Sequence, residues 1–287
     1  MKKIYVLILV VVLLYSCNNK KKQENKNEQS VKNSYENECN SCYNGCYDNL
    51  DTAIAHYGAV SYLSIHRKKY KNLPIEIKKM NQLMKMEINK QPYLNWASTF
   101  DMLSTLDSLK EITIEDCNIS DNKENRFYGL RNIDKIKNLK EFVLIDSTLN
   151  YFPYSILGCK NIETLHILSP IKHIPKEIEV LKNLKELTIT WNEATLPLEI
   201  LTLSNLEILN LNKSKINSLP VELSKLKKLK ELWVADTPFA EELDYYHRLK
   251  QYNEIETLKK LLPHCIIYIN NPPPCGGVKS DTSTKKK

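Results

Sequence analysis

Apolar residues recur along the chain with a spacing that fits neither a lone helix nor a lone strand. In residues 203–220, leucine or isoleucine stands at positions 203, 206, 209, 211, 216 and 219, so steps of three give way to a step of two and then five. A helix face would keep steps of three and four, and a half-buried strand would keep steps of two. The stretch therefore predicts a compound unit in which a short strand is joined to a tight turn.

The same spacing recurs eight times between residues 60 and 234. Each copy has an apolar first residue, another three positions later and a third two positions after that; the first residues are Val60, Leu83, Leu109, Leu139, Ile162, Leu184, Leu206 and Leu229. Five copies also carry a proline nine positions before the first residue: Pro74, Pro153, Pro175, Pro197 and Pro220. Proline cannot donate to a continuing strand ladder, so it is expected to open the return to the next strand through a short 3₁₀ or helical turn.

This unit resembles the leucine-rich repeat, which reads LxxLxLxx(N/C)xL. At the Asn/Cys position, Asn192 and Cys117 match, Ser147, Ser214 and Thr237 are small polar stand-ins, and Pro170, Gln91 and Lys68 depart. The resemblance covers roughly 220 residues and implies an α/β repeat solenoid. We expect a leucine-rich repeat horseshoe with a parallel concave sheet of about eight short strands and short helical or 3₁₀ convex segments.

The N-terminus predicts export and a lipid anchor. Two lysines precede an apolar run from Ile4 to Tyr15, which is too short for a membrane span and fits a signal peptide. The sequence Leu-Tyr-Ser-Cys that ends at Cys17 resembles a bacterial lipobox, which implies cleavage before Cys17 and its lipidation. An ordinary signal peptide that leaves a free cysteine is the alternative. The predicted location is the bacterial cell envelope, either the outer membrane or the cell surface.

Seven further cysteines are Cys39, Cys42, Cys46, Cys117, Cys159, Cys265 and Cys275. Cys117 and Cys159 occupy repeat positions that predict buried thiols. For the other five, disulfides that close the solenoid ends suit an exported chain, and several connectivities fit. The cluster at 39–46 lacks a fourth ligand at a spacing typical of a metal or iron–sulfur site, so no metal is expected.

The ends of the repeat array predict caps, because an open solenoid end exposes its core. Asn49 or Asp51 is expected to cap a short helix before the first repeat, and residues 255–270 predict a helix followed by a strand. The predicted division is a signal peptide at 1–16, a disordered tether at 17–38, a cysteine-containing N-terminal cap at 39–59, repeats at 60–254, a C-terminal cap at 255–270 and a disordered tail at 271–287.

Four residues of each repeat are predicted to point outward on the concave face. They are the second, fourth, sixth and seventh residues after the first apolar residue, and they are called the second, fourth, sixth and seventh positions. The fourth positions are Ser64, Glu87, Thr113, Val143, His166, Thr188, Asn210 and Trp233, and the sixth are His66, Asn89, Glu115, Ile145, Leu168, Thr190, Asn212 and Ala235. The seventh positions include Asp116, Asp146, Trp191, Lys213 and Asp236, and the second include Glu111, Glu141, Glu186 and Glu231.

Two groups of these outward residues are candidate binding features. The first is an apolar and aromatic patch, typical of interface anchors: Val143, Ile145, His166, Leu168, Trp191 and Trp233. The alternative is that some of these side chains only cover the sheet. The second is the row of glutamates, each of which follows a lysine: Lys110, Lys140, Lys185 and Lys230. We interpret this row as charge pairing between stacked strands.

No catalytic or cofactor motif occurs in the sequence, and a Cys/His site at Cys117 is disfavoured against a buried thiol. The net charge of +7 includes six lysines in the two tails, at 20–22 and 285–287, and no basic face carries interleaved aromatics, so no nucleic-acid partner is expected. The sequence therefore predicts a non-enzymatic, membrane-tethered protein without a cofactor that binds a protein or peptide partner. The alternatives are a structural or adhesion protein without one defined ligand, and a hydrolase or thiol enzyme with an unrecognised site.

Overall fold

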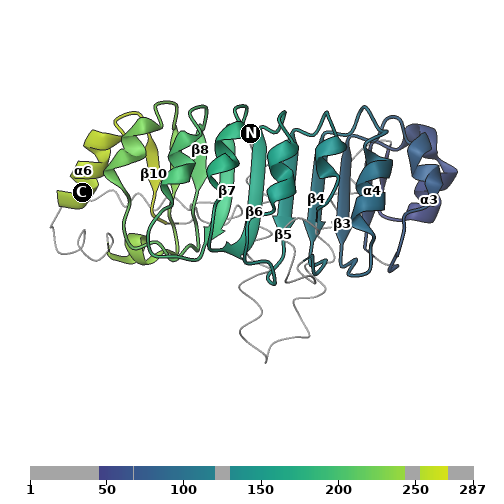
Figure 1. Cartoon of the computed structure of the whole chain (residues 1–287), viewed down its shortest axis with the longest axis horizontal. Coiled ribbons are helices and arrows are strands. Elements are labelled where there is room, and N and C mark those ends of the chain that lie inside the picture. The colour runs from purple at the N-terminus through teal and green to yellow at the C-terminus, as the bar shows by residue number, and fades with distance from the viewer. Residues whose placement is uncertain (1–44, 67, 120–129, 243–252, 271–287) are drawn as a thin grey trace, which may run out of the picture. The chain divides into compact units, whose positions relative to one another are not determined.

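The fold is one parallel sheet whose strands follow each other in chain order. A computed structural model describes residues 45–66, 68–119, 130–242 and 253–270. Within them, ten strands lie side by side in the order β1 to β10 (Figure 1). The strands are β1 (Cys46–Tyr47), β2 (Tyr62–Ile65), β3 (Lys85–Asn89), β4 (Glu111–Glu115), β5 (Glu141–Ile145), β6 (Thr164–Ile171), β7 (Glu186–Trp191), β8 (Ile208–Asn210), β9 (Glu231–Trp233) and β10 (Ile266–Tyr268).

Short helical segments connect the strands and form a second layer. They are α3 (Leu50–Ala55), η2 (Tyr57–Ala59), η3 (Ile75–Lys79), α4 (Trp96–Leu103), η4 (Ile133–Lys135), η5 (Tyr154–Gly158), η6 (Lys176–Val180), η7 (Leu198–Thr202), η8 (Val221–Lys225) and α6 (Asn253–Leu261). The 3₁₀ segments η3, η5, η6, η7 and η8 each begin directly after a repeat proline, as predicted. Successive segments from η3 to η8 contact one another, so they stack in step with the strands.

The core lies between the sheet and the helical segments. The apolar residues that define each repeat pair in register from strand to strand, as with Leu187 beside Leu209 and Leu209 beside Leu232. These three side chains are fully buried. The predicted fold class, a leucine-rich repeat solenoid with a parallel sheet and short 3₁₀ or helical segments, is therefore confirmed. The sheet has two strands more than predicted because β1 and β10 extend it beyond the eight repeats.

The segments that flank the repeats continue the same layers. The Asn49 side chain accepts hydrogen bonds from the backbone N–H groups of Asp51 and Thr52 and so caps α3. At the other end, α6 and β10 are the predicted helix and strand. The predicted signal peptide, tether and tail, with Cys17, Cys39, Cys42 and Cys275, lie outside the described residues. In the described part of the chain, no helix has both the length and the apolarity to cross a membrane.

Several side chains replace the repeat's usual asparagine and still tie adjacent repeats together. Gln91, which the sequence comparison treats as a departure, is fully buried and donates to the Lys68 carbonyl at 2.7 Å while accepting from the Tyr70 N–H at 2.9 Å. The Ser214 hydroxyl accepts from the Trp191 N–H at 2.8 Å. Since each bond satisfies a backbone group of the neighbouring repeat, stacking survives the loss of the consensus residue.

The seventh repeat position behaves in two different ways, which corrects the prediction that it always points outward. Lys90, Asp116, Lys213 and Asp236 have positive φ angles of 54°, 49°, 63° and 56°, so the chain turns there. Asp146 instead is 1% exposed, and it accepts from the Ile119 N–H at 2.8 Å and the Thr148 N–H at 2.9 Å. This carboxylate takes over the bridging role of the asparagine in its repeat.

Candidate functional site on the open face of the sheet

The sheet face opposite the core, here called the open face, consists of rows of side chains that cross the strands. Strand pairing aligns the second position of each repeat in one row: Tyr62, Lys85, Glu111, Glu141, Thr164, Glu186, Ile208, Glu231 and Ile266. The fourth positions form a central row that runs from Ser64 through Val143, His166 and Thr188 to Trp233. In the row of second positions, Tyr62 to Glu231 are half-buried, whereas most of the central row is buried.

The predicted apolar patch is only partly assembled on this face. Val143 and Ile145 on β5 pair with His166 and Leu168 on β6, so these four side chains are neighbours. Val143, Ile145 and His166 are 3%, 4% and 4% exposed, whereas Leu168 is half-buried. An interface anchor must offer exposed apolar surface to a partner, and three of these four side chains expose very little surface. Their role in partner binding stays a prediction.

Trp191 is not on the open face, and its prediction as a surface anchor is wrong. On β7 it alternates with Thr190 and follows the core residues Leu187 and Ile189, so its side chain turns inward. It is 4% exposed, belongs to the hydrophobic core and donates its indole N–H to the Thr195 carbonyl at 2.7 Å. The physical reason is that β7 continues to Trp191, where it pairs with Ile171 across a register shift in β6.

Trp233 lies on the open face but is covered by its own chain. Its ring stacks on Tyr268 of β10 with centroids 3.7 Å apart and planes 12° apart, and its indole N–H donates to Glu231 at 3.0 Å. The residue is 7% exposed. Three strand spacings of about 4.8 Å separate it from His166, so it is a separate element near the C-terminal end of the sheet.

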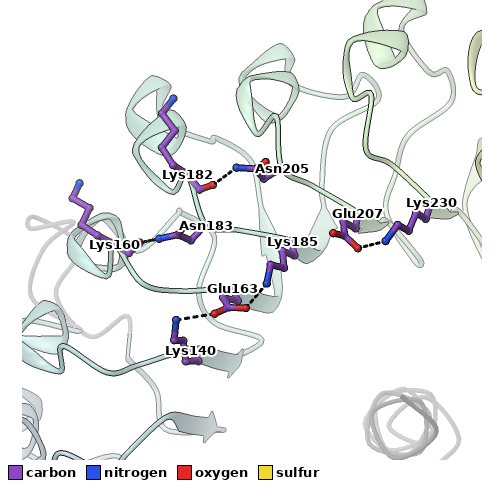
Figure 2. Close-up of polar contacts among 9 residues, drawn as sticks. All are labelled: Lys140, Lys160, Glu163, Lys182, Asn183, Lys185, Asn205, Glu207 and Lys230. Carbon is purple, nitrogen blue, oxygen red and sulfur yellow. Dashed lines mark hydrogen bonds and ion pairs between the residues drawn. The ribbon is translucent and has the colours of Figure 1, made fainter.

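The lysines that precede three of the open-face glutamates do not pair with them, which corrects the charge-pairing interpretation. They pair with other glutamates, which lie beside them at the edge of the sheet. Figure 2 shows an alternating edge ladder of Lys140, Glu163, Lys185, Glu207 and Lys230. The Glu163 carboxylate accepts from Lys140 at 2.7 Å and from Lys185 at 2.6 Å, and Glu207 accepts from Lys230 at 2.5 Å. The two lysine hydrogen bonds hold the pKa of Glu163 at about 2. These three lysines therefore bind glutamates of their own line and not those of the open face.

A ladder of asparagines beside this line was missed at the sequence level. Four asparagine side chains each donate to a backbone carbonyl of the preceding repeat, at 2.7–2.9 Å: Asn138 to Asp107, Asn161 to Lys137, Asn183 to Lys160 and Asn205 to Lys182. Figure 2 shows the last two bonds. The signal in the sequence is an asparagine directly before the first apolar residue of four successive repeats. The ladder fixes the spacing of the strand starts and has a structural role.

The acidic row is defined as Glu111, Glu141, Glu186 and Glu231, which all lie in the row of second positions. Three members have a neighbour: Lys85 Nζ lies 3.9 Å from the Glu111 carboxylate, the His166 ring nitrogen lies 3.1 Å from Glu186, and the Trp233 indole donates to Glu231 at 3.0 Å. Burial raises the pKa of Glu141, and the neighbouring charge of Glu111 raises it further. The open face therefore presents carboxylates that are partly desolvated and close together.

The described thiols and acidic groups give no sign of a reactive or metal centre. Burial raises the pKa of both Cys117 and Cys159 to about 12, so neither supplies a thiolate near neutral pH. The predicted buried-thiol role of both is confirmed by exposures of 1% and 4%. Across the described ranges, no group of three or more His, Cys, Asp or Glu side chains is placed to hold a metal ion.

Comparison with known proteins supports the fold. Neither a family model nor a curated protein matches the chain. Among solved structures, the leucine-rich repeat domain of the type III effector XopL matches with a TM-score of 0.50 and 16% identity, over 91% of this chain and 88% of that one. An internalin C2 from Listeria monocytogenes has a TM-score of 0.48 and 21% identity, over 64% of this chain and 75% of the internalin chain. TLR13, solved in a complex with ssRNA13, has a TM-score of 0.49 and 17% identity over 62% of this chain. The match spans 29% of the TLR13 chain. The chain has the leucine-rich repeat fold.

Proposed function

We propose that this chain is a non-enzymatic, membrane-tethered leucine-rich repeat protein that binds a protein or peptide partner on the open face of its sheet. The observation that carries the proposal is the acidic row, which is half-buried and lacks the lysines that precede it in sequence. A sheet face that only had to be soluble would gain from pairing those charges across neighbouring strands. Concentrated charge of one sign is instead typical of a surface that recognises a partner of the opposite charge.

The tether rests on the sequence around Cys17, which resembles a lipobox after a short apolar run. A diacylated cysteine partitions stably into a membrane, whereas a single acyl chain gives marginal binding. We therefore propose that the protein lies in the bacterial cell envelope, at the outer membrane or cell surface, with residues 17–38 as its tether.

A structural or adhesion role without one defined ligand is the second candidate. It would be favoured by an evenly polar open face, whereas glutamates gather on this face, and the lysines that precede three of them pair with Glu163 and Glu207 of the edge ladder (Figure 2). An enzymatic role finds no support in Cys117 and Cys159, because their pKa of about 12 keeps both protonated. Nucleic acid is a poor partner for this face, since phosphates and carboxylates repel each other.

The test is a selection of displayed random peptides on the purified protein. Thr164→Trp fills the open face between Glu141 and Glu186 without changing charge, and Val221→Trp is the matched control on η8, where Val221 is 61% exposed. Selected peptides are expected to lose binding to Thr164→Trp and to keep it on Val221→Trp. Peptides that bind both variants equally, or a selection that enriches nothing, would reject the proposed function.

A further inference from the structure

The open face is acidic although the chain as a whole is basic. Six glutamates point from this face, namely Glu87, Glu111, Glu115, Glu141, Glu186 and Glu231, and Lys85 is the one lysine that the strand register places among them in the described strands. The formal net charge of the chain is +7. The negative charge is therefore a local property of one face and not a consequence of composition.

Glu141 stands at the centre of this charge. Strand pairing places it directly beside Glu111, at a strand spacing of about 4.8 Å. Among the described residues, no side chain lies within ion-pair or hydrogen-bond distance of its carboxylate, whereas Glu87 accepts from the Tyr62 hydroxyl at 2.7 Å and Glu231 accepts from the Trp233 indole. Lys85 is already close to both Glu87 and Glu111, at 3.4 Å and 3.9 Å.

The same face also holds two neutral polar groups that have no hydrogen-bond partner in the described structure, a hydroxyl and an amide oxygen. The Thr188 hydroxyl, in a residue that is 4% exposed, has no partner in the described structure, and neither has the Asn89 side-chain oxygen. Strand alternation places both on the open face, with Thr188 beside His166 and Asn89 beside Glu115. Buried polar groups are normally hydrogen-bonded, so a ligand on this face could supply a hydrogen-bond partner to each of these two atoms.

A surplus of acceptors and negative charge defines the complementary ligand. An arginine side chain has five N–H donors, no acceptor and a permanent positive charge, and it pairs with two carboxylate oxygens at once. Asn89 on β3 and Thr188 on β7 are four strand spacings apart, about 19 Å, which an extended segment of about six residues spans. The half-buried Leu168 gives such a segment an apolar contact within this strip.

We infer that the partner is a cationic polypeptide that crosses β3 to β7 in an extended form and places arginine between Glu111 and Glu141, with further donors at Asn89 and Thr188. This inference rests on the proposed function and specifies the chemistry of its ligand. Lysine satisfies the charge but supplies fewer donors in a less fixed geometry, so arginine binds more tightly.

The first arm of the test compares two capped peptides in fluorescence anisotropy with the purified chain. In one, arginine alternates with valine; in the other, citrulline replaces arginine and keeps its shape without its charge. The arginine peptide is expected to bind at least about tenfold more tightly, and its advantage is expected to fall as salt rises, because screening weakens exposed charge pairs. Equal binding of the two peptides would overturn the inference.

The second arm uses matched variants that remove one negative charge each. Glu141→Gln is expected to weaken binding of the arginine peptide at least about fivefold. Glu163→Gln, in the edge ladder, is expected to change the affinity less than about twofold. Equal losses would mean that only the overall charge matters and would overturn the inference. Circular dichroism of both variants checks that the fold is kept.

Two further outcomes separate this inference from the proposed function. If the displayed peptides that depend on the open face carry no arginine or lysine, the cationic partner is wrong while the proposed function stands. If a variant with glutamine at Lys285, Lys286 and Lys287 binds the arginine peptide at least about tenfold more tightly, the chain's own tail is the occupant and a separate cationic partner is overturned.

Discussion

Replacing Trp191 with alanine should destabilise the protein strongly, because this tryptophan is a core residue. It is 4% exposed, and a buried aromatic side chain removes about 150–250 Å² from water. At about 25 cal/mol per Å² this corresponds to about 4–6 kcal/mol, and measured Trp→Ala changes in cores cost about 3–5 kcal/mol. The bond from the indole N–H to the Thr195 carbonyl contributes about 1 kcal/mol of this total.

Urea unfolding followed by circular dichroism measures the effect. Trp191→Ala is expected to lower the free energy of unfolding by about 3–5 kcal/mol. Trp191→Phe, which keeps most of the apolar volume and loses the hydrogen bond, is expected to cost about 1–2 kcal/mol. Leu198→Ala is the control, because Leu198 is 55% exposed and its change is expected to stay within about 0.5 kcal/mol. A loss below about 1 kcal/mol in Trp191→Ala would refute the inward placement of the indole.

Three further predictions concern charge and anchoring. Burial and Glu111 raise the folded-state pKa of Glu141, so its contribution favours folding at low pH and is lost as pH rises through that pKa. Glu141→Gln should therefore raise the free energy of unfolding at neutral pH, by up to about 0.5 kcal/mol in thermal melts, and an unchanged or lower value would contradict this. Glu163 has a pKa of about 2, so its ion pairs stabilise the fold above about pH 4.5 and lose that effect as pH falls through about 2; Glu163→Gln should cost about 0.5 kcal/mol at neutral pH because the site is exposed, and no cost there would count against the edge ladder. Cys17→Ser should move the protein from the membrane fraction to the soluble fraction, and a wild-type chain without acyl mass would disprove the lipid anchor.

The repeat spacing was sufficient to predict the fold because apolar burial dictates it. Leu206, Leu209 and Leu211 have to reach one core, and only a strand followed by a turn places steps of three and two on one side. The same argument placed the second and fourth repeat positions on the open face. The strand β10 was predicted as part of the C-terminal cap, whereas β1 was not, because it has two residues and carries no repeat pattern.

The placement of Trp191 was beyond the repeat pattern because it depends on strand length. At Lys213 the strand has ended and the chain turns with a positive φ, whereas β7 continues through Trp191 and keeps its side chain on the core face. The register shift in β6 between Ile167 and Pro170 brings Ile171 beside the tryptophan, and a single sequence gives no direct signal for such an irregularity.

The charge pairs could have been predicted more fully than they were. Glu163 and Glu207 occupy the same repeat position as Lys140, Lys185 and Lys230, so an alternating ladder is visible in the sequence. Side chains at equal positions of neighbouring parallel strands are close in space, whereas consecutive residues of one strand point to opposite faces. Comparing the same position across successive repeats therefore predicts which glutamates pair with a lysine.

Photo-crosslinking in the cells that make the protein tests the central claim, that the open face holds a polypeptide partner. Benzoylphenylalanine at Thr164, in the row of second positions, is compared with the same residue at Val221 on η8. The account predicts a discrete adduct of higher mass from Thr164 that digests with protease, and none from Val221. An adduct from Val221 alone, or the absence of any adduct from Thr164, would contradict it.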